Sequence, residues 1–461
     1  MSEETKSTLT YSKKTVWETA SSEEIEKAYA YAEGYRTFID RCKTERESVI
    51  EGIRMVEKAG FVPFQFGDNL KAGGRYYYNN RGKNLFAFVI GTEPLSEGVR
   101  ITGAHIDSPR LDLKQIPLYE DSGLAYLKTH YYGGIRKYQW PTIPLALHGV
   151  VVRADGTTVE VCIGEDESDP ILYITDLLPH LASADNAKPL GTAVPAEKLN
   201  LVIGTRPLSP EGDSQIRENV LRLLNEKYRI DESDFMSAEL CAVPAYKSRD
   251  VGLDRSLIAA YGHDDRVCAY PALTGLLEAA EESKHTMLCI LADKEETGSD
   301  GPSGMQCDLL VDLLDEIARY GNISPAALRC ASKCVSSDVS ACLDPNFADV
   351  FEKNNACLLG CGVTMNKYTG SGGKYGTNDA TAEYVGFIRR AMAAYHVVWQ
   401  TAELGRVDAG GGGTIAKFVS HHNIDTIDMG VGVLSMHAPC EIISKVDLYE
   451  AHKAFKAFNC F

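Results

Sequence analysis

The chain has 461 residues, of which 44% are hydrophobic and 24% are charged, and its formal net charge is −17 at pH 7. Because this length exceeds that of one ordinary hydrophobic core, we expect at least two compact units that are folded almost throughout. The negative charge is not interrupted by any cluster of lysine and arginine, which argues against binding to nucleic acid or to an anionic membrane surface.

The N-terminal stretch and the cysteines indicate the compartment. The start, MSEETKSTLT, lacks the basic and apolar regions of a secretory signal, and no stretch reaches the ~18 apolar residues of a membrane span. The 13 cysteines lie mostly in apolar runs without regular spacing, which indicates reduced thiols rather than a disulfide framework. Cys330 with Cys334 and Cys357 with Cys361 share one spacing, but on strand-like runs such residues are ~13 Å apart, which disfavours a zinc ribbon. We therefore expect a cytoplasmic protein.

Helices open the chain and strands follow. Residues 21–42 and 44–61 each begin with a hydroxyl residue followed three places on by glutamate, a pattern typical of a capping box at a helix start. Residues 84–91 and 98–108 are short apolar runs with β-branched and aromatic residues, which predicts core strands. The second of these runs ends in polar residues.

The pattern of apolar and polar residues changes near residue 113 and changes back near residue 242. Residues 147–164 alternate apolar and polar side chains around an Asp-Gly pair, which predicts an antiparallel hairpin in a β-rich unit. Further along, strands and helices alternate, which indicates an α/β sheet with helices on both faces. We predict one α/β domain formed by residues 1–112 and 242–461 and interrupted by an inserted β-rich domain, residues 113–241.

The elements predicted in the last part of the chain alternate regularly. The predicted helices are residues 264–283, 308–321, 380–395 and 413–422, with a final helix at the C-terminal end. The predicted strands are residues 285–293, 334–340, 357–365, 397–403 and 426–437.

Side chains that can bind metals gather at the predicted strand ends and before one helix. They are His105, Asp107, Asp293, Glu295, Glu296, Asp338 and His437 at strand ends, and Asp264 and Asp265 before the helix. Sites in open α/β sheets form at the carboxyl ends of strands, so we expect these groups on one edge. Each alone is more often a cap or a hydrogen-bond partner. Together they supply what divalent cations need, because clustered carboxylates cannot be buried without a cation or a proton.

The number of these groups suits two cations better than one. Two ions ~3.5 to 4 Å apart, bridged by one carboxylate and a water molecule, would lower the pKa of that water. A further carboxylate that is not a ligand must then accept the proton. The adjacent Glu295 and Glu296 can divide these roles, one as ligand and one as base.

Five motifs carry a resemblance to a known family. GAHIDSPRLDLK, GHDDR, DKEETGSDG, SSDVS and LSMHAPCE, in this order and with a β-rich insertion between the first two, resemble the M18 metalloaminopeptidases, most closely the bacterial aminopeptidase 1 branch. The resemblance spans nearly the whole chain. It implies a zinc-peptidase α/β/α sandwich with a mixed central sheet, residues 1–112 and 242–461 as the catalytic domain, and residues 113–241 as a β-rich dimerisation domain.

The resemblance also implies roles for single residues. One zinc ion would be held by His105 and Asp338 and a second by Glu296 and His437. The bridging ligand would be Asp265, which aligning the following helix favours, or else Asp264. Glu295 would be the general base, and Asp107 would orient the His105 imidazole. Manganese or cobalt would be able to substitute for zinc.

Substrate contacts are predicted at four positions. Lys367 and Tyr375 match positions that the family uses near the substrate. Gly411 belongs to a glycine run before a predicted helix, where backbone amides would bind a carboxylate or an oxyanion, or where the glycines simply form a tight turn. His180 resembles a histidine that the family presents from a neighbouring subunit. The resemblance therefore implies a dimer building block and a tetrahedral dodecamer.

The leading hypothesis is a dinuclear zinc aminopeptidase that hydrolyses the N-terminal residue from peptides through a metal-bridging hydroxide, with Glu295 as general base. A dimetal carboxypeptidase or deacylase is an alternative, which a requirement for a free substrate amine would oppose. A self-assembling shell with a vestigial site is a third hypothesis, which an absence of hydrolysis would favour. Lys367 is compatible with acidic N-terminal residues but leaves the preference between acidic and neutral residues open.

Overall fold

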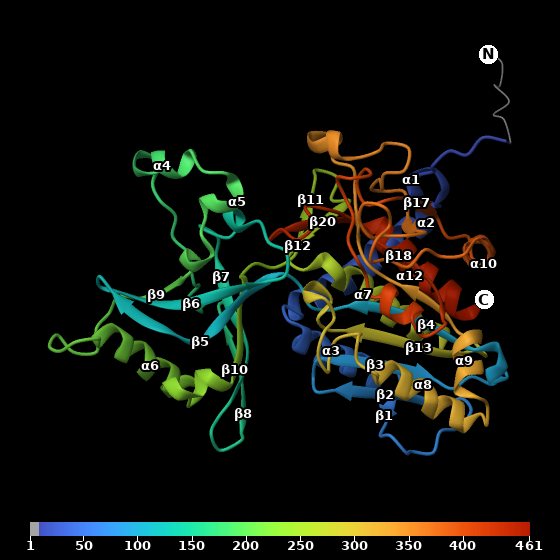
Figure 1. Ribbon diagram of the computed structural model, residues 1–461, viewed down its shortest axis with the longest axis horizontal. Coiled ribbons are helices and arrows are strands. Elements are labelled where there is room, and N and C mark those ends of the chain that lie inside the picture. The colour runs from blue at the N-terminus through green and yellow to red at the C-terminus, as the bar shows by residue number, and fades with distance from the viewer. Residues whose placement is uncertain (1–8) are drawn as a thin grey trace, which may run out of the picture.

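The computed structural model describes residues 9–461, so most of the polar N-terminal stretch lies outside the described residues. The strands form three sheets, of nine, six and five strands. Figure 1 shows two lobes, a smaller one with the six-stranded sheet and a larger one with the other two sheets. The protein is thus a mixed α/β protein, as the sequence predicted.

The nine-stranded sheet is mixed. Its strands in spatial order are β1 (Val62–Pro63), β2 (Arg75–Asn80), β3 (Asn84–Val89), β13 (Thr286–Ala292), β4 (Val99–His105), β14 (Lys333–Ser336), β18 (Asp425–Gly430), β16 (Val363–Asn366) and β17 (Trp399–Thr401). The four strands β13, β4, β14 and β18 are parallel neighbours, whereas β3 runs antiparallel to β13 and β16 runs antiparallel to β18. The carboxyl ends of the four parallel strands therefore meet at one edge.

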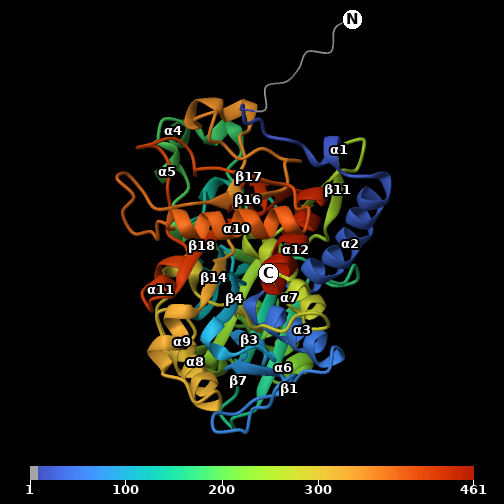
Figure 2. The ribbon, with the colours of Figure 1, turned by 90° about the vertical axis from the view of Figure 1, so that its right-hand side faces the viewer.

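Helices cover both faces of this sheet (Figure 2). One apolar core joins it to α2 (Ser22–Arg41), α3 (Glu45–Lys58), α7 (His263–Ala279), α10 (Ala382–Ala394) and α12 (Lys445–Cys460). A second core joins it to α8 (Leu309–Tyr320), α9 (Pro325–Ala331) and α11 (Ala416–Ser420). Strand β13 supplies Cys289 and Leu291 to the first core and Leu288 and Ile290 to the second, as side-chain alternation along a strand requires. Within residues 9–461 no helix has the length and apolar character that crossing a bilayer requires.

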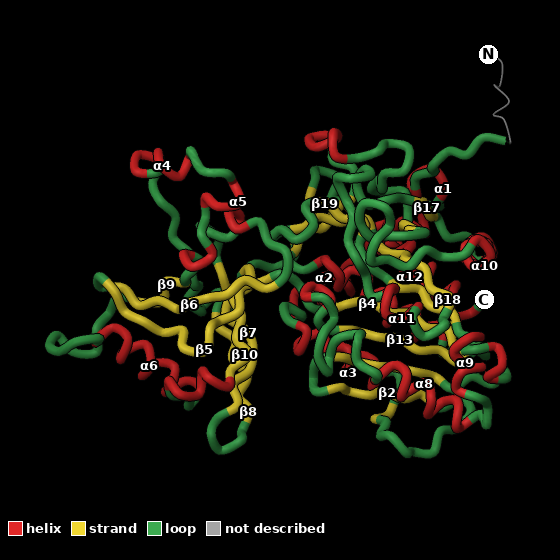
Figure 3. Tube along the Cα trace, in the orientation of Figure 1, coloured by secondary structure: helices red, strands yellow, loops and turns green. Residues whose placement is uncertain are grey.

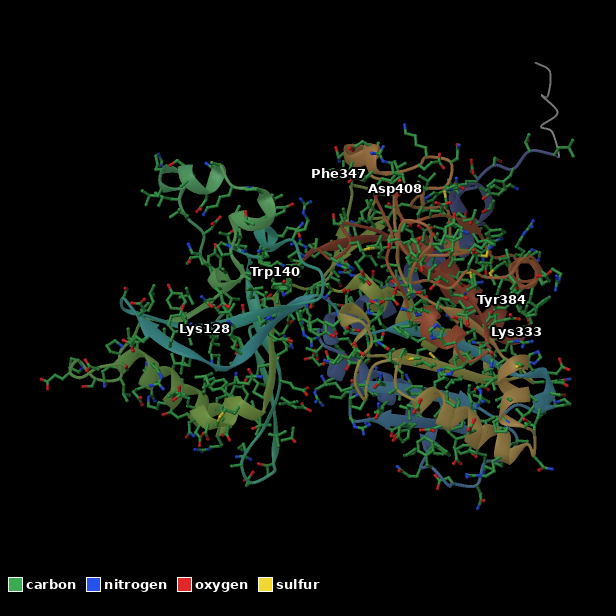
Figure 4. All side chains as sticks on the ribbon, viewed as in Figure 1. Lys128, Trp140, Lys333, Phe347, Tyr384 and Asp408 are labelled. Carbon is green, nitrogen blue, oxygen red and sulfur yellow. The ribbon has the colours of Figure 1, made fainter. Side chains whose placement is uncertain are left out.

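The smaller lobe has its own core around the six-stranded sheet. Its strands in spatial order are β8 (Thr158–Ile163), β7 (Leu145–Val152), β10 (Ala238–Pro244), β5 (Arg110–Asp121), β6 (Leu124–Tyr132) and β9 (Leu201–Gly204). The predicted hairpin is confirmed, because β7 and β8 pair antiparallel on either side of the Asp-Gly turn. Trp140, labelled in Figure 4, is fully buried in this core, which is separate from the two cores of the larger lobe. Figure 3 shows the strands of the six-stranded sheet set apart from those of the larger lobe.

Four further α-helices complete the described part of the two lobes. The smaller lobe carries α4 (Ser183–Asn186), α5 (Leu190–Ala193) and α6 (Gln215–Tyr228), and α1 (Val16–Thr19) lies in the larger lobe. Apolar side chains of α6, among them Val220 and Leu224, pack against the core of the smaller lobe.

The five-stranded sheet departs from the predicted pattern. Its strands in spatial order are β11 (Arg249–Val251), β12 (Leu257–Ala260), β20 (Glu441–Ser444), β19 (Gly432–Leu434) and β15 (Ser340–Ala341). The single strand predicted over 426–437 is wrong, because the chain leaves the nine-stranded sheet after Gly430 and joins the five-stranded sheet at Gly432. Gly430 passes so close to Asp338 that a Cβ atom would lie 2.0 Å from the Asp338 carbonyl oxygen. Only glycine permits this approach.

Candidate metal centre

The predicted metal-binding residues meet where the nine-stranded and five-stranded sheets adjoin. His105 ends β4, Glu295 and Glu296 follow β13, and Asp338 follows β14, so these residues lie at the shared edge of three parallel neighbours. The other residues come from the five-stranded sheet: Asp264 and Asp265 follow β12, and His437 follows β19. The prediction of one sheet edge for all of them therefore holds for only part of the set.

The Asp264 carboxylate lies between the two histidines. Its Oδ1 atom is 3.1 Å from His105 Nε2, and its Oδ2 atom is 3.3 Å from His437 Nε2. Asp265, the residue that the sequence favoured for this place, instead accepts the backbone N–H of His105 at 3.2 Å through Oδ2. The alignment with the following helix that favoured Asp265 does not extend to this point, because the backbone of Asp264 and of Asp265 is not helical, although both lie in the first turn of α7. The geometry favours Asp264 as the group that faces both histidines.

Two overlapping sets of side chains can each hold a cation. In the first set, one atom each from His105, Asp265 and Asp338 lies within 4.8 Å of the others, and in the second the same holds for His105, Asp264 and Glu296. His437 Nε2 is 3.7 Å from Glu296 Oε1, which brings the second histidine to the second set. Asp265 Oδ1 and Glu296 Oε1 are buried without a hydrogen-bond partner. Carboxylate oxygens and imidazole nitrogens are zinc ligands, so these residues fit zinc.

The pKa values in the cluster are shifted by burial and by the crowding of like charges. Burial raises the pKa values of Glu296 and Asp338 well above their usual range. Burial also acts to raise the pKa of Asp264, but the contacts with His105 and His437 outweigh it and lower that pKa. Burial acts to lower the pKa of His437, but Asp264 and Glu296 raise it to about 10. Raised carboxylate pKa values favour bound protons, which a cation would displace.

Glu295 stands beside this cluster. It begins a 3-10 turn, and its Oε2 atom is 3.9 Å from His105 Nε2. Burial raises the pKa of Glu295 to about 7, with Asp107 and Asp264 adding to the effect and His105 opposing it. Glu295 lines the same cavity as the ligand set without belonging to either group of ligand atoms.

Asp107 holds the turn that carries both glutamates. Its Oδ1 and Oδ2 atoms accept the backbone N–H groups of Glu295 and Glu296, each at 3.2 Å. The Tyr132 hydroxyl donates to Oδ2 at 2.7 Å, and His105 Nδ1 lies 3.0 Å from the Asp107 carbonyl oxygen and 3.4 Å from Oδ1. The sequence singled out Asp107 but gave no signal for Tyr132, which ends β6 in the smaller lobe.

A cavity of about 630 Å³ opens over the cluster. Tyr375 and Gly411, two of the four predicted substrate contacts, line it. Lys367 is not among the lining residues and forms an ion pair with Asp379. His180 is exposed on the smaller lobe and does not line the cavity of its own chain.

The glycine run is anchored by a residue that the sequence did not suggest. Asp428 on β18 lines the cavity, and its Oδ1 atom accepts the hydroxyl of Ser336 at 2.9 Å and that of Thr414 at 2.7 Å. Helix α11 begins at Ala416, later than predicted, so Thr414 and the preceding glycines form a loop along the cavity wall.

A buried cluster of histidines and carboxylates beneath a cavity, at the edge of a mixed α/β sheet, defines a metallohydrolase. The model of the family described as Aminopeptidase I zinc metalloprotease (M18) matches residues 38–459. The chain belongs to this family and is a metalloaminopeptidase.

Known members of the family are similar to this chain over almost its whole length. The chain is 49% identical over 454 residues to the probable M18 family aminopeptidase 1 of Clostridium acetobutylicum, which covers 96% of this chain and 97% of that relative. The crystal structure of the M18 aminopeptidase of Thermotoga maritima has a TM-score of 0.92 at 44% identity and covers 97% of this chain and 99% of that one. The mApe1 dodecamer of S. cerevisiae has a TM-score of 0.77 at 20% identity over 93% of this chain and 96% of that one, and so shares the fold.

Proposed function

We propose that the chain is a dinuclear zinc aminopeptidase that removes the N-terminal residue from peptides, with Glu295 as general base. The observation that carries the proposal is the Asp264 carboxylate, whose two oxygens face His105 and His437 while Glu295 lies beside His105 in the same cavity. One carboxylate between two histidines suits a pair of cations that share a bridging ligand.

The ligands divide into two sets around Asp264. His105 and Asp338 would hold one zinc ion, Glu296 and His437 would hold the other, and Asp264 would bridge them in place of Asp265. Asp265 would support the first position through the His105 backbone, because its Oδ2 atom accepts that N–H group. Asp107 would orient the His105 imidazole, since His105 Nδ1 faces it. Manganese or cobalt would be accepted at the same positions.

The protein groups then have distinct tasks. Zinc ions at these positions would polarise the scissile carbonyl and acidify a water molecule. Glu295 accepts a proton from that water and delivers it to the amine that leaves. Asp107 keeps Glu295 and Glu296 in fixed directions through their backbone N–H groups, so the base and the neighbouring ligand do not exchange places.

The surrounding residues would complete substrate binding. Tyr375 and Gly411 line the cavity and would contact the peptide. Lys367 would reach the substrate only by leaving Asp379, and His180 would act in the cavity of a neighbouring subunit. Residues 113–241 would then form a dimerisation domain within a cytoplasmic dodecamer. The dodecamer named for the yeast protein of the same fold supports an oligomer of this kind.

A Glu295→Gln variant tests the proposal. We expect kcat on aminoacyl arylamides to fall about 10²- to 10⁴-fold while the zinc content stays at two ions per chain, because the base is removed and the ligands remain. Glu160→Gln, an exposed position on β8, is the matched control and should leave kcat unchanged. Activity of Glu295→Gln near that of the parent protein would overturn the mechanism. Equal hydrolysis of substrates with blocked amines would favour the carboxypeptidase or deacylase alternative.

A further inference from the structure

Two buried carboxylates beneath the metal centre each accept a pair of backbone N–H groups. Asp107 is one of them. The other is Glu441, whose Oε2 atom accepts the Asp264 N–H at 3.1 Å and whose Oε1 atom accepts the His437 N–H at 2.8 Å. Glu441 is only 1% exposed. Each of its two oxygens therefore accepts a backbone hydrogen bond, from two residues whose side chains face each other across the centre.

The position of Glu441 in the fold explains how it reaches both residues. It begins β20 and pairs with Ala260 at the end of β12, four residues before Asp264. His437 lies four residues before Glu441, in the loop between β19 and β20. One side chain in a regular strand therefore holds two irregular loops, and these loops carry the carboxylate and the imidazole that stand 3.3 Å apart.

The backbone of His437 needs such support. Its φ is +64°, in the left-handed region that residues other than glycine rarely adopt. Its Nδ1 atom is 2.8 Å from the Gly134 carbonyl oxygen, which fixes the ring but not the backbone. The hydrogen bond from the His437 N–H to Glu441 fixes the backbone.

We propose that Glu441 is a positioning residue for the second zinc site: by holding the backbone N–H groups of Asp264 and His437, it sets the distance between their side chains. Glu441 does not line the cavity and belongs to neither set of possible ligands. The inference rests on the proposed function, because the spacing matters only if the two side chains share a cation.

The test compares Glu441→Gln with a matched change elsewhere. Glutamine keeps one acceptor oxygen but sets an amide NH₂ against a backbone N–H, so one of the two loops loses its anchor. Asp447→Asn is the control, because Asp447 is also buried and accepts two backbone N–H groups, those of Gly360 and Gly362 at 2.7 Å each, in a different part of the larger lobe.

Zinc bound per chain is measured after dialysis against buffered zinc, together with kcat, KM and the unfolding temperature of the metal-free proteins. We expect Glu441→Gln to bind the weaker of two zinc ions about 10- to 100-fold less tightly and to lose kcat with little change in KM. Asp447→Asn should keep both ions and full kcat even if its metal-free form unfolds at a lower temperature. If Glu441→Gln does not fold, Glu441→Asp replaces it, since the shorter carboxylate reaches only one of the two N–H groups.

Two results would overturn the inference: parental zinc affinity in the Glu441 variants, or equal loss of zinc in these variants and in Asp447→Asn. Failure of the proposed function has a different signature. In that case the unchanged protein itself would bind fewer than two zinc ions or would hydrolyse no aminoacyl substrate.

Discussion

The contact between the lobes contains a buried histidine that should make stability depend on pH. His148 on β7 of the smaller lobe lies 2.7 Å from Glu47 Oε1 on α3 of the larger lobe through Nδ1, and 3.2 Å from Glu165 Oε1 through Nε2. Its side chain is only 2% exposed. Lys43 and Lys247 lie 4.0 and 3.8 Å from the Glu165 carboxylate and balance part of its charge.

The magnitude of this pH dependence follows from the shift in the pKa of His148. Burial acts to lower the pKa of His148, but the hydrogen bonds to Glu165 and Glu47 outweigh it and raise the pKa to about 9. An ordinary histidine has a pKa of about 6.5, and one pKa unit corresponds to about 1.4 kcal/mol, so the protonated state contributes about 3 kcal/mol to folding. Because the folded pKa is the higher one, this contribution is complete below about pH 6.5 and is lost as the pH rises to about 9.

The assay is chemical unfolding of the parent protein and of His148→Gln, followed by tryptophan fluorescence, at about pH 6 and about pH 9.5. The stability difference between the two proteins should shrink by about 3 kcal/mol from the lower to the higher pH. His130→Gln, an exposed position on strand β6 of the same sheet, controls for the loss of a histidine and should show no such trend. A stability difference that is the same at both pH values would refute the reasoning.

Further predictions concern the metal centre and its surroundings. Removal of divalent cations should abolish activity and lower the unfolding temperature, and added zinc should restore both. The reason is that a ligand at about 1,000 times its Kd contributes about 4 kcal/mol to stability. An unchanged unfolding temperature would speak against bound metal. Tyr132→Phe removes the hydroxyl that donates to Asp107, so kcat should fall about tenfold without loss of zinc. An unchanged kcat would show that this hydrogen bond does not affect catalysis. Gly411→Ala should raise KM about tenfold, because φ is +122° and a Cβ would lie 1.9 Å from the Gly370 carbonyl oxygen. Gly191→Ala, which meets no neighbour within 4 Å, should leave KM unchanged, and equal effects of the two changes would contradict the argument.

Local signals in the sequence were sufficient to predict most of the helices and strands named below. The capping boxes of Ser21 with Glu24 and of Thr44 with Glu47 are present at the starts of α2 and α3. Apolar runs located β3, β4 and β13, the predicted helices located α7, α8 and α10 within a few residues, and the predicted final helix is α12. These elements are set by contacts close in sequence, and the apolar pattern already encodes them.

The sequence could not predict features that depend on distant contacts. The passage of the chain from β18 to β19 depends on how closely Gly430 approaches Asp338, which no local pattern reports. The choice between Asp264 and Asp265 depends on an irregular backbone at the start of α7, where helical periodicity does not apply. Glu441 stood in a recognised motif, but its partner Asp264 is far away in the sequence, so its role was not visible.

The strands that connect the two lobes also contact residues of the candidate metal centre. The chain enters this lobe at β5 and leaves it at β10, and the two strands pair there through Leu111 and Ala242. Strand β6 returns to the same point, where Tyr132 contacts Asp107 and the carbonyl oxygen of Gly134 faces His437. Two contacts that hold residues of the candidate metal centre therefore come from the segment that ends β6, and the smaller lobe meets the larger one at the floor of this centre. A substitution that displaces this segment should therefore also disturb the side chains of Asp107 and His437.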